Sequence, residues 1–310
     1  MITILMAAYN GQKYLAEQID SVLNQTERDW KLIVQDDCSR DATFAVAKEY
    51  SLRYPDRISA VYRESPSGSA QNNFFSMLRF ADSEYVMFCD DDDIWLPEKA
   101  EITLSEMKRL EKICGQDKPL LVHTDLRVAD GALVPLADSM MRMQKLAPSH
   151  RELNHLLVQN NVTGCTMMVN RRLLELAVER GLPRRAVMHD WWFALIASAL
   201  GRIGFVPRAT ILYRQHRGNQ IGAKNAGSLR YNLGRFLNGA EVRRSLAAAY
   251  GQAGEFSERF GPLLGEEQNR ILAEFLSIPS RSKPERLRIL WKNDFWKSGF
   301  LRRFGQIWFL

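Results

Sequence analysis

The stretch Tyr85-Val86-Met87-Phe88-Cys89-Asp90-Asp91-Asp92-Asp93 joins an apolar run directly to four consecutive aspartates. The apolar run predicts a buried strand over 85–89. Four adjacent carboxylates repel one another, and a single aspartate would be enough to cap the helix expected over 98–113. Hard divalent cations bind carboxylate oxygens and bridge them to phosphates. The stretch therefore favours a metal–diphosphate site over a solvated acidic turn.

Two other apolar runs end in polar residues in the same way. The run 2–9 stops at Asn10, and the strand expected over 30–34 leads into Asp36 and Asp37. Helical spacing separates these strands, which predicts βαβ units, an α/β fold and a mostly parallel sheet flanked by helices. Ligands bind such sheets at the carboxyl ends of the strands. The three polar clusters are therefore expected to converge on one site.

The rest of the chain continues the alternation of helices and strands, with two exceptions. Residues 137–155 are rich in methionine and predict a mobile loop, and the chain beyond residue 225 has a helical pattern throughout. The chain thus divides into an α/β domain, 1–225, and a helical extension, 226–310. Elsewhere the periodicity predicts helices over 12–25, 42–52, 70–81, 171–180 and 191–200, and strands over 58–62, 120–123 and 163–169.

Asp36 and Asp37 have two interpretations. They form a turn followed by a helix cap, or a carboxylate there accepts a hydrogen bond from a nucleobase N–H or a ribose hydroxyl. Their place beside the other two clusters favours the second interpretation. Tyr9 would pack on the base or simply at the end of its strand, and the sequence leaves both open.

A second group of candidate residues lies in the C-terminal half of the α/β domain. In His189-Asp190-Trp191-Trp192 a carboxylate stands beside two aromatic rings, an apolar setting that can raise its pKa toward that of a general base. The alternative is that Asp190 caps the helix over 191–200. His216 ends the stretch Tyr213-Arg214-Gln215-His216 and is either solvent-facing or a ligand of a metal or a diphosphate.

The 310 residues carry a net charge of +6, and the C-terminal tail accounts for all of it. Residues 281–310 hold eight basic and two acidic residues, so the remainder of the chain is neutral. This distribution argues against a nucleic-acid-binding face. The four cysteines include no CxxC pair, which argues against a zinc site or a disulfide framework. The N-terminus is typical of a buried strand rather than a signal peptide, and no run is long enough to cross a bilayer.

Aromatic residues alternate with the basic residues of this tail. Trp296, Phe300, Phe304 and Trp308 recur every four residues, which would place them along one side of a helix. Such a helix suits the surface of an anionic membrane. The alternative is a terminal helix packed on the α/β domain, and Gly299 and Asp294 weaken the membrane interpretation.

Taken in order, these motifs resemble those of family-2 glycosyltransferases of the GT-A fold. The resemblance covers roughly residues 1–220, and several ordered motifs together are more specific than any one of them. The closest pattern is that of bacterial rhamnosyltransferase-like enzymes of surface-polysaccharide synthesis. It rests on Ala8-Tyr9-Asn10-Gly11, on 35–43, on 90–99, on Thr163-Gly164-Cys165, on 189–192 and on 213–216.

The resemblance implies a donor site and a metal site. Tyr9 and Asp37 would contact the nucleobase, and Asp90 would face the ribose. The metal, Mn²⁺ or Mg²⁺, would be held by Asp92, with Asp93 and His216 as further ligands. One departure is the fully acidic cluster, because these enzymes often have a neutral second residue there, and it leaves open which carboxylate holds the metal. The donor-binding set as a whole would be Ala8, Tyr9, Asn10, Asp36, Asp37, Asp90 and Asp91.

The resemblance also implies a catalytic base and an acceptor side. Asp190 matches the base, which would deprotonate an acceptor hydroxyl for an inverting transfer. The implied activity moves a sugar, rhamnose among the candidates, from a nucleoside diphosphate to a saccharide or a polyprenyl-linked acceptor. The implied location is the cytoplasm, peripheral at the inner face of the plasma membrane. The acceptor side would include Thr163, Gly164, Trp191 and Trp192.

Other functions remain open from the sequence. A hexosyl or N-acetylhexosaminyl transferase that uses a UDP-sugar would carry the same motifs. A nucleotidyltransferase also combines a parallel sheet with acidic metal ligands, but its Gly-rich phosphate loop is replaced here by Asn10-Gly11-Gln12-Lys13. A non-catalytic nucleotide-sugar-binding or scaffold protein would not need both Asp92 and Asp190.

Overall fold

The strand β1 (Ile2–Ala8) lies inside the sheet, and its side chains alternate between two hydrophobic layers. Leu5 packs into one layer, whereas Ile4 and Met6 pack into the other. A strand that is buried on both faces has a continuous apolar sequence, as the run 2–9 does. The computed structural model describes residues 1–216 and 239–309.

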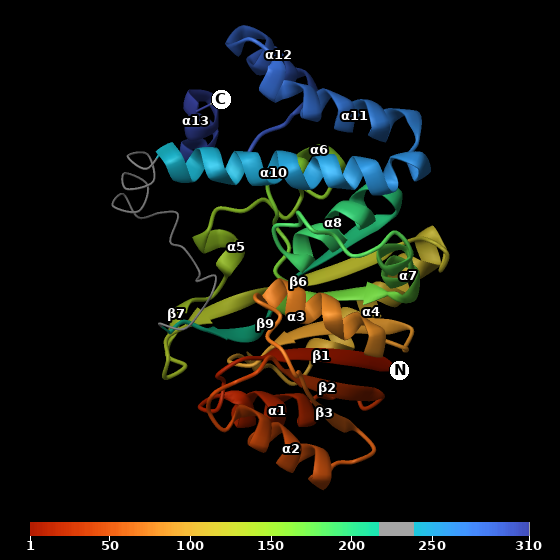
Figure 1. Cartoon of the computed structure of the whole chain (residues 1–310), viewed down its shortest axis with the longest axis vertical. Coiled ribbons are helices and arrows are strands. Elements are labelled where there is room, and N and C mark those ends of the chain that lie inside the picture. The colour runs from red at the N-terminus through yellow and green to blue at the C-terminus, as the bar shows by residue number, and fades with distance from the viewer. Residues whose placement is uncertain (217–238, 310) are drawn as a thin grey trace.

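Nine strands form one sheet in these ranges, with helices on both faces (Figure 1). The path through the sheet is β3-β2-β1-β4-β8-β6-β9-β5, and β7 pairs with β6. Besides β1, the strands are β2 (Trp30–Asp36), β3 (Ile58–Tyr62), β4 (Tyr85–Asp90), β5 (Ile94–Trp95), β6 (Leu120–Ala129), β7 (Pro135–Ala137), β8 (Met167–Asn170) and β9 (Arg202–Arg214).

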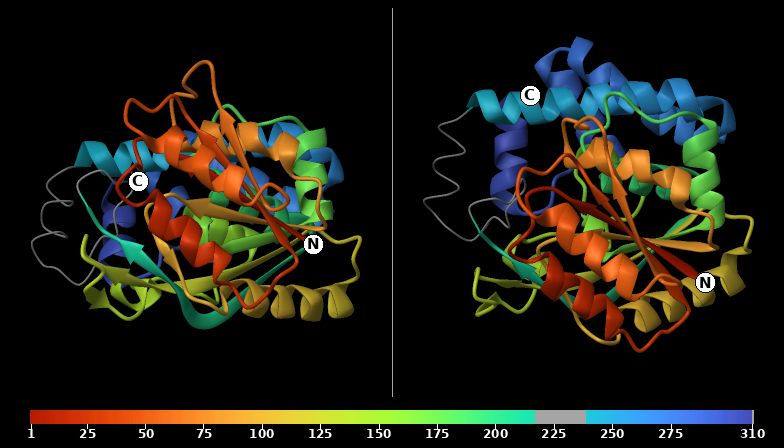
Figure 2. Two further views of the ribbon diagram at one scale, coloured as in Figure 1. Left: turned by 90° about the horizontal axis from the view of Figure 1, so that it is seen from below. Right: turned by 60° about the horizontal axis from the view of Figure 1, so that its bottom comes forward.

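The helices divide between the two faces of the sheet. One hydrophobic layer lies under α1, α2 and α4, and the other lies under α3 and α6–α8 with the C-terminal helices beyond them (Figure 2). The helices before the undescribed segment are α1 (Leu15–Leu23), α2 (Thr43–Arg53), α3 (Ala70–Met77), α4 (Lys99–Cys114), α5 (Met140–Met143), α6 (Leu153–Val158), α7 (Arg171–Glu179) and α8 (His189–Leu200).

The register of the parallel strands aligns the three predicted polar clusters. β1 pairs in parallel with β2 and with β4, so that Ala8 lies opposite Asp36 and Ala7 lies opposite Asp90. The strand ends therefore meet at one edge, as the sequence predicted. The α/β class, with a mostly parallel sheet and a helical C-terminal region, is confirmed, although β8 runs antiparallel between β4 and β6.

Three local predictions were wrong. The segment 137–155 contains the helix α5 and the start of α6 rather than one irregular loop. The strand expected from residue 163 begins only at Met167, because a 3₁₀ turn occupies Gly164–Thr166. The helix expected from 191 begins at His189, so Asp190 lies in its first turn instead of capping it.

The C-terminal region consists of α10 (Gly239–Phe260), α11 (Glu266–Ser277), α12 (Lys283–Asn293) and α13 (Phe300–Phe309). Its aromatic side chains complete the core above α6 and α8. The predicted domain boundary at 225/226 lies outside the described residues. No helix among the described residues combines the length and apolar character needed to cross a bilayer. The core residues that this region supplies include Phe256, Phe260, Phe275, Phe295 and Trp296.

The tail does not form the single helix that its aromatic spacing suggested. α12 ends at Asn293, Asp294 adopts a left-handed conformation with φ 52°, and α13 begins only after Gly299, whose φ is 87°. Trp296 falls in the connection and is buried, so it does not share a helical face with Phe300. Removal of the tail would therefore open the core.

Candidate active site

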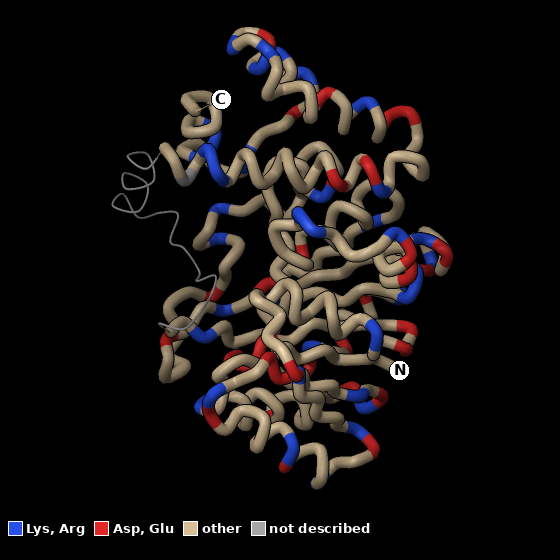
Figure 3. Tube along the Cα trace, in the orientation of Figure 1, with Lys and Arg blue, Asp and Glu red and all other residues tan. Residues whose placement is uncertain are grey.

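A cavity of about 1060 Å³ opens at the edge where β1 and β4 end. Acidic residues gather at this edge of the sheet (Figure 3). Asp36, Asp93 and Trp192 do not line the cavity, unlike the other predicted site residues. Those that do line it are Ala8, Tyr9, Asn10, Asp37, Asp90, Asp91, Asp92, Thr163, Gly164, Asp190, Trp191 and His216.

The turn after β1 is held by Asp91. The backbone N–H of Tyr9 donates to Asp91 Oδ2 at 3.0 Å. A Cβ atom at Gly11 would lie only 2.2 Å from the same oxygen, so this position has room for glycine alone. Asn10 has a φ of 51° and its N–H donates to Ser39 Oγ. Asp91 thus positions the backbone under the exposed ring of Tyr9.

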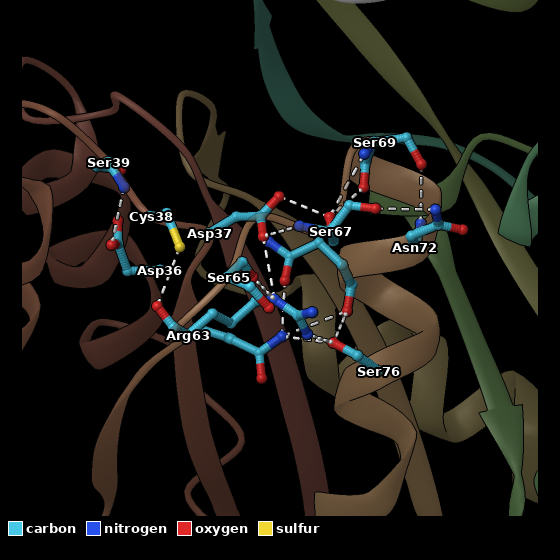
Figure 4. A network of polar contacts seen from close by, with 12 residues as sticks. Asp36, Asp37, Cys38, Ser39, Arg63, Ser65, Ser67, Ser69, Asn72 and Ser76 are labelled. Atoms are coloured by element: carbon cyan, nitrogen blue, oxygen red, sulfur yellow. Dashed lines mark hydrogen bonds and ion pairs between the residues drawn. The ribbon is translucent and has the colours of Figure 1, made fainter.

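Asp37 sits in a polar network at the end of β2 (Figure 4). Its carboxylate accepts hydrogen bonds from the backbone N–H of Ser67 at 2.7 Å and from Ser67 Oγ at 2.6 Å. Arg63, just after β3, forms an ion pair with it at 3.1 Å. Asp36 is fully buried behind this network and accepts from Ser39 N–H. Asp37 can therefore face a ligand, whereas Asp36 organises the turn.

The four aspartates after β4 point in different directions. Asp92 Oδ2 lies 2.8 Å from His216 Nε2, and both residues line the cavity. Asp93 is fully buried, and its Oδ1 accepts from the backbone N–H of Arg214 at 3.0 Å. Its predicted role as a metal ligand is untested, but its orientation makes it a support for the end of β9.

The electrostatics of this cluster fit a bound cation. Burial raises the pKa of Asp90 to about 7, and the charges of Asp92 and Asp190 add to that rise. Burial and neighbouring aspartates also raise the pKa of Asp93 well above its usual range. Ligand atoms of Asp90, Asp93 and Cys165 lie within 4.8 Å of one another, but Asp93 and Cys165 are buried and do not line the cavity. The carboxylates that a cation in the cavity would meet are those of Asp90 and Asp92. A divalent cation would relieve this repulsion among carboxylates that Mn²⁺ or Mg²⁺ accept as ligands.

Arg214 is a structural residue of the site that the sequence interpretation missed. Its buried guanidinium donates to the backbone oxygens of Asp92 at 2.8 Å and Gly131 at 3.0 Å, and to Glu17 Oε2 at 2.6 Å. It thereby ties α1, the aspartate cluster and the segment after β6 together beside His216. A buried arginine must satisfy its five N–H donors, which explains these long-range contacts.

Asp190 lies in the first turn of α8 with its carboxylate at the cavity wall. Oδ1 accepts a hydrogen bond from Asn160 Nδ2, and Oδ2 accepts one from the backbone N–H of Gly164, each at 2.9 Å. Burial raises the pKa of Asp190 to about 7. A carboxylate with that pKa, held in a fixed orientation, is suited to general base catalysis near neutral pH. Asn160 was not predicted, because nothing in the sequence connects it to Asp190.

The two tryptophans that follow Asp190 have separate roles. Trp191 lines the cavity, and its Nε1 donates to the carbonyl oxygen of Leu156 at 2.6 Å. Trp192 is fully buried and packs edge-on against Phe256 and Phe260. Trp192 therefore packs in the core, because adjacent residues of a helix point to different faces. Its predicted acceptor-side role is untested, but it does not line the cavity.

Gly164 has no side chain, and this leaves room for the side chains of His189 and Asp190 beside it. A Cβ at this position would lie 2.6 Å from His189 Nε2 and 3.6 Å from Asp190 Oδ2. We expect Gly164→Ala to destabilise the protein by about 1–3 kcal/mol through overpacking against the ring of His189. Turnover should also fall, because His189 begins the helix that carries Asp190. Gly251→Ala is the matched control, because its Cβ meets no atom within 4 Å. Melting temperature and activity equal to those of the wild type in Gly164→Ala would refute this account of the position.

The chain matches the family described as "Glycosyl transferase family 2" over residues 3–174. The dTDP-rhamnosyl transferase RfbG of Shigella flexneri is 26% identical over 235 residues, which cover 73% of this chain and 76% of that protein. Among solved structures, S. aureus TarS 1–349 in complex with UDP has a TM-score of 0.58 at 18% identity, covering 91% of this chain and 73% of that one.

A second similar structure is the mannosyltransferase PcManGT from Pyrobaculum calidifontis in complex with GDP-Man and Mn²⁺. Its TM-score is 0.53 at 16% identity, and the match covers 95% of this chain and 84% of that one. At these identities the two solved structures show a shared fold.

Proposed function

Because this chain belongs to glycosyl transferase family 2, with the GT-A fold, we propose that it transfers a sugar from a nucleoside-diphosphate donor with inversion, using Asp190 as the base. The observation that carries the proposal is one cavity that is lined both by the aspartate cluster and by Asp190, whose pKa burial raises to about 7. The acceptor hydroxyl gives its proton to Asp190, and its oxygen forms the new bond to the anomeric carbon. The bond from that carbon to the diphosphate breaks on the opposite side.

The donor would lie along the edge of the sheet between Asp37 and Asp190. Tyr9 and Asp37 stand at the nucleobase end, where Arg63 and Ser67 fix the carboxylate of Asp37. Asp90 and Asp92 line the cavity and would hold the metal together with His216, which also lines it. A divalent cation there would neutralise charge on the departing diphosphate. The Mn²⁺ in the PcManGT complex supports this assignment by analogy of fold.

The donor is proposed to be dTDP-rhamnose, as for RfbG, and a UDP-sugar is the alternative that the TarS complex supports. A thermal-shift panel of dTDP-rhamnose, UDP-glucose, UDP-N-acetylglucosamine and GDP-mannose in Mn²⁺ tests this choice. We expect dTDP-rhamnose to raise the melting temperature more than the other three do, whereas a larger shift with UDP-glucose or UDP-N-acetylglucosamine would favour the alternative. Stabilisation by nucleoside triphosphates alone would favour a nucleotidyltransferase instead.

The C-terminal tail supports a membrane-linked acceptor. Ser298 N–H donates to Gln159 Oε1, which places the connection before α13 beside the segment that carries Asn160 and Asn161 at the cavity wall. Trp291 and Phe300 are 73% and 81% exposed. Basic residues accompany them on α12 and α13 (Figure 3). This combination suits an anionic lipid surface, and we propose a polyprenyl-linked acceptor presented from it at the inner face of the plasma membrane.

The double substitution Trp291→Ser and Phe300→Ser should weaken sedimentation with phosphatidylglycerol vesicles about tenfold or more, since each buried aromatic side chain contributes roughly 1.5–3 kcal/mol. The melting temperature should stay close to that of the wild type, because both side chains are exposed. Leu52→Ser with Leu136→Ser is the matched control, since these exposed side chains lie outside the tail. A wild-type protein that ignores anionic vesicles would overturn the membrane proposal.

A further inference from the structure

His189, the first residue of α8, is buried at the cavity wall, and its ring makes no hydrogen bond with any described residue. It is 2% exposed, and neither ring nitrogen has a partner anywhere in the two described ranges. Its ring packs on Phe74 with centroids 4.2 Å apart and on Phe88 at 5.2 Å. The bare Cα of Gly164 makes room for the edge of the ring that carries Nε2. The protein thus keeps a polar ring where a phenylalanine would pack.

An unpartnered imidazole in such a place is unfavourable for the protein alone. A neutral imidazole offers one N–H donor and one acceptor nitrogen. Leaving either without a partner costs the desolvation of that group, which an apolar ring of the same shape would not incur. Burial lowers the pKa of His189 to about 3, so the ring is neutral at physiological pH. Both hydrogen-bonding functions are therefore present and unused.

His189 lines the cavity and is close to both of its chemical centres, which indicates what it meets. Phe88, on which it packs, is two residues before Asp90 in β4, and Asp190 follows His189 directly. Asp190 is close enough to Asp90 for its charge to raise the pKa of that carboxyl. In a sugar transfer, the ring of the sugar must lie between the diphosphate, at the aspartate cluster, and the attacking hydroxyl, at Asp190.

We propose that the ring nitrogens of His189 hydrogen-bond hydroxyl groups of the donor's sugar ring, so that His189 is a sugar-binding residue of the donor site. The inference rests on the proposed function and adds the residue that binds the sugar of the donor rather than its nucleotide. Neutral imidazole suits a hydroxyl, which is both a donor and an acceptor. It would not add a charge beside Asp190 and the aspartate cluster.

The test compares His189→Phe with His123→Phe. His123 is the matched control, because it is also buried, packs on Phe205 and lacks partners for both ring nitrogens, yet does not line the cavity. Affinities for the sugar nucleotide that stabilises the wild type best and for the corresponding nucleoside diphosphate are measured by calorimetry in Mn²⁺. We expect His189→Phe to lose about tenfold or more in affinity for the sugar nucleotide and about twofold or less for the nucleoside diphosphate. His123→Phe should match the wild type for both ligands.

Three results would overturn the inference. These are wild-type affinity for the sugar nucleotide in His189→Phe, an equal loss for both ligands, or the same loss in His123→Phe. A second measurement needs no substitution at position 189. In the wild type, the ¹⁵N resonances of the His189 ring, assigned by substituting the other four histidines in turn, should shift with the sugar nucleotide and not with the nucleoside diphosphate. Unchanged resonances would contradict the proposal, whereas a wild type that binds no sugar nucleotide would refute the proposed function itself.

Discussion

Asp190→Asn should lower kcat on the order of 100-fold or more while leaving the affinity for the sugar nucleotide nearly unchanged. Asparagine keeps the size of the side chain but cannot accept the proton of the acceptor hydroxyl. The loss should therefore appear in the transition state and not in donor binding, which steady-state kinetics and calorimetry separate. An equal fall in donor affinity would show that Asp190 binds the donor or supports the fold instead.

Asp125→Asn is the matched control for this substitution. Asp125 is 8% exposed, as Asp190 is, and its carboxylate also accepts two hydrogen bonds or more, from the backbone N–H of Leu126 and from Ser139 Oγ. It does not line the cavity that holds Asp190. Loss of a buried carboxylate should therefore affect the stability of both variants, whereas turnover should fall in Asp190→Asn and not in Asp125→Asn.

The same assignment fixes the sign of the pH dependence. Burial raises the pKa of Asp190 to about 7, and only the ionised form can act as the base. Turnover by the wild type should therefore rise with pH through about 7 and fall about tenfold per pH unit below it. The residual turnover of Asp190→Asn should lack this limb. If the turnover of the wild type instead falls as the pH rises through about 7, the protonated form of Asp190 is the active one and its assignment as the base is wrong.

Asp92→Asn should lower turnover on the order of 100- to 1000-fold and weaken the binding of nucleoside diphosphate in Mn²⁺. Asp92 lies at the cavity wall and contacts His216, so its charge faces the place where the diphosphate would lie. The substitution removes one negative charge from a cluster whose pKa values are already raised by burial and mutual repulsion. The remaining carboxylates should then hold a cation less tightly.

Chelation provides the control for Asp92→Asn. Excess chelator should reduce the turnover of the wild type to the level of the variant and should leave the variant almost unaffected. If the wild type retains its full activity in excess chelator, the metal assignment is wrong, although Asp92 could still bind the donor directly.

The sequence located the edge of the sheet that carries the site because that edge depends on local patterns. Each apolar run predicts a strand, each polar cluster marks its end, and parallel pairing brings Ala8, Asp36 and Asp90 into one layer. The direction in which each side chain points at that edge could not be predicted from these patterns. Neighbouring residues of one motif diverge, so that Asp92 lines the cavity while Asp93 turns inward.

Residues that depend on tertiary contacts were missed for a different reason. Asn160 reaches Asp190 from a segment 30 positions earlier, and Arg214 reaches Glu17 across 197 positions. No spacing rule connects such pairs. The prediction of a single helix in the C-terminal tail was wrong for the opposite reason. The aromatic spacing is regular in the sequence, although the helix breaks at Asp294 and Gly299. Trp296 is buried in the core and does not continue the helical face that the spacing predicted.

Release of nucleoside diphosphate from a sugar nucleotide would show whether the protein transfers sugar with Asp190 as the base. The wild type would be incubated in Mn²⁺ with dTDP-rhamnose, UDP-glucose, UDP-N-acetylglucosamine or GDP-mannose, with and without a saccharide acceptor. We expect release from one of these donors, and faster release with the acceptor than without it. The sugar should be recovered on the acceptor in the opposite anomeric configuration, and Asp190→Asn should suppress the release. No release from any of the four donors, or release that is the same in Asp190→Asn as in the wild type, would contradict it.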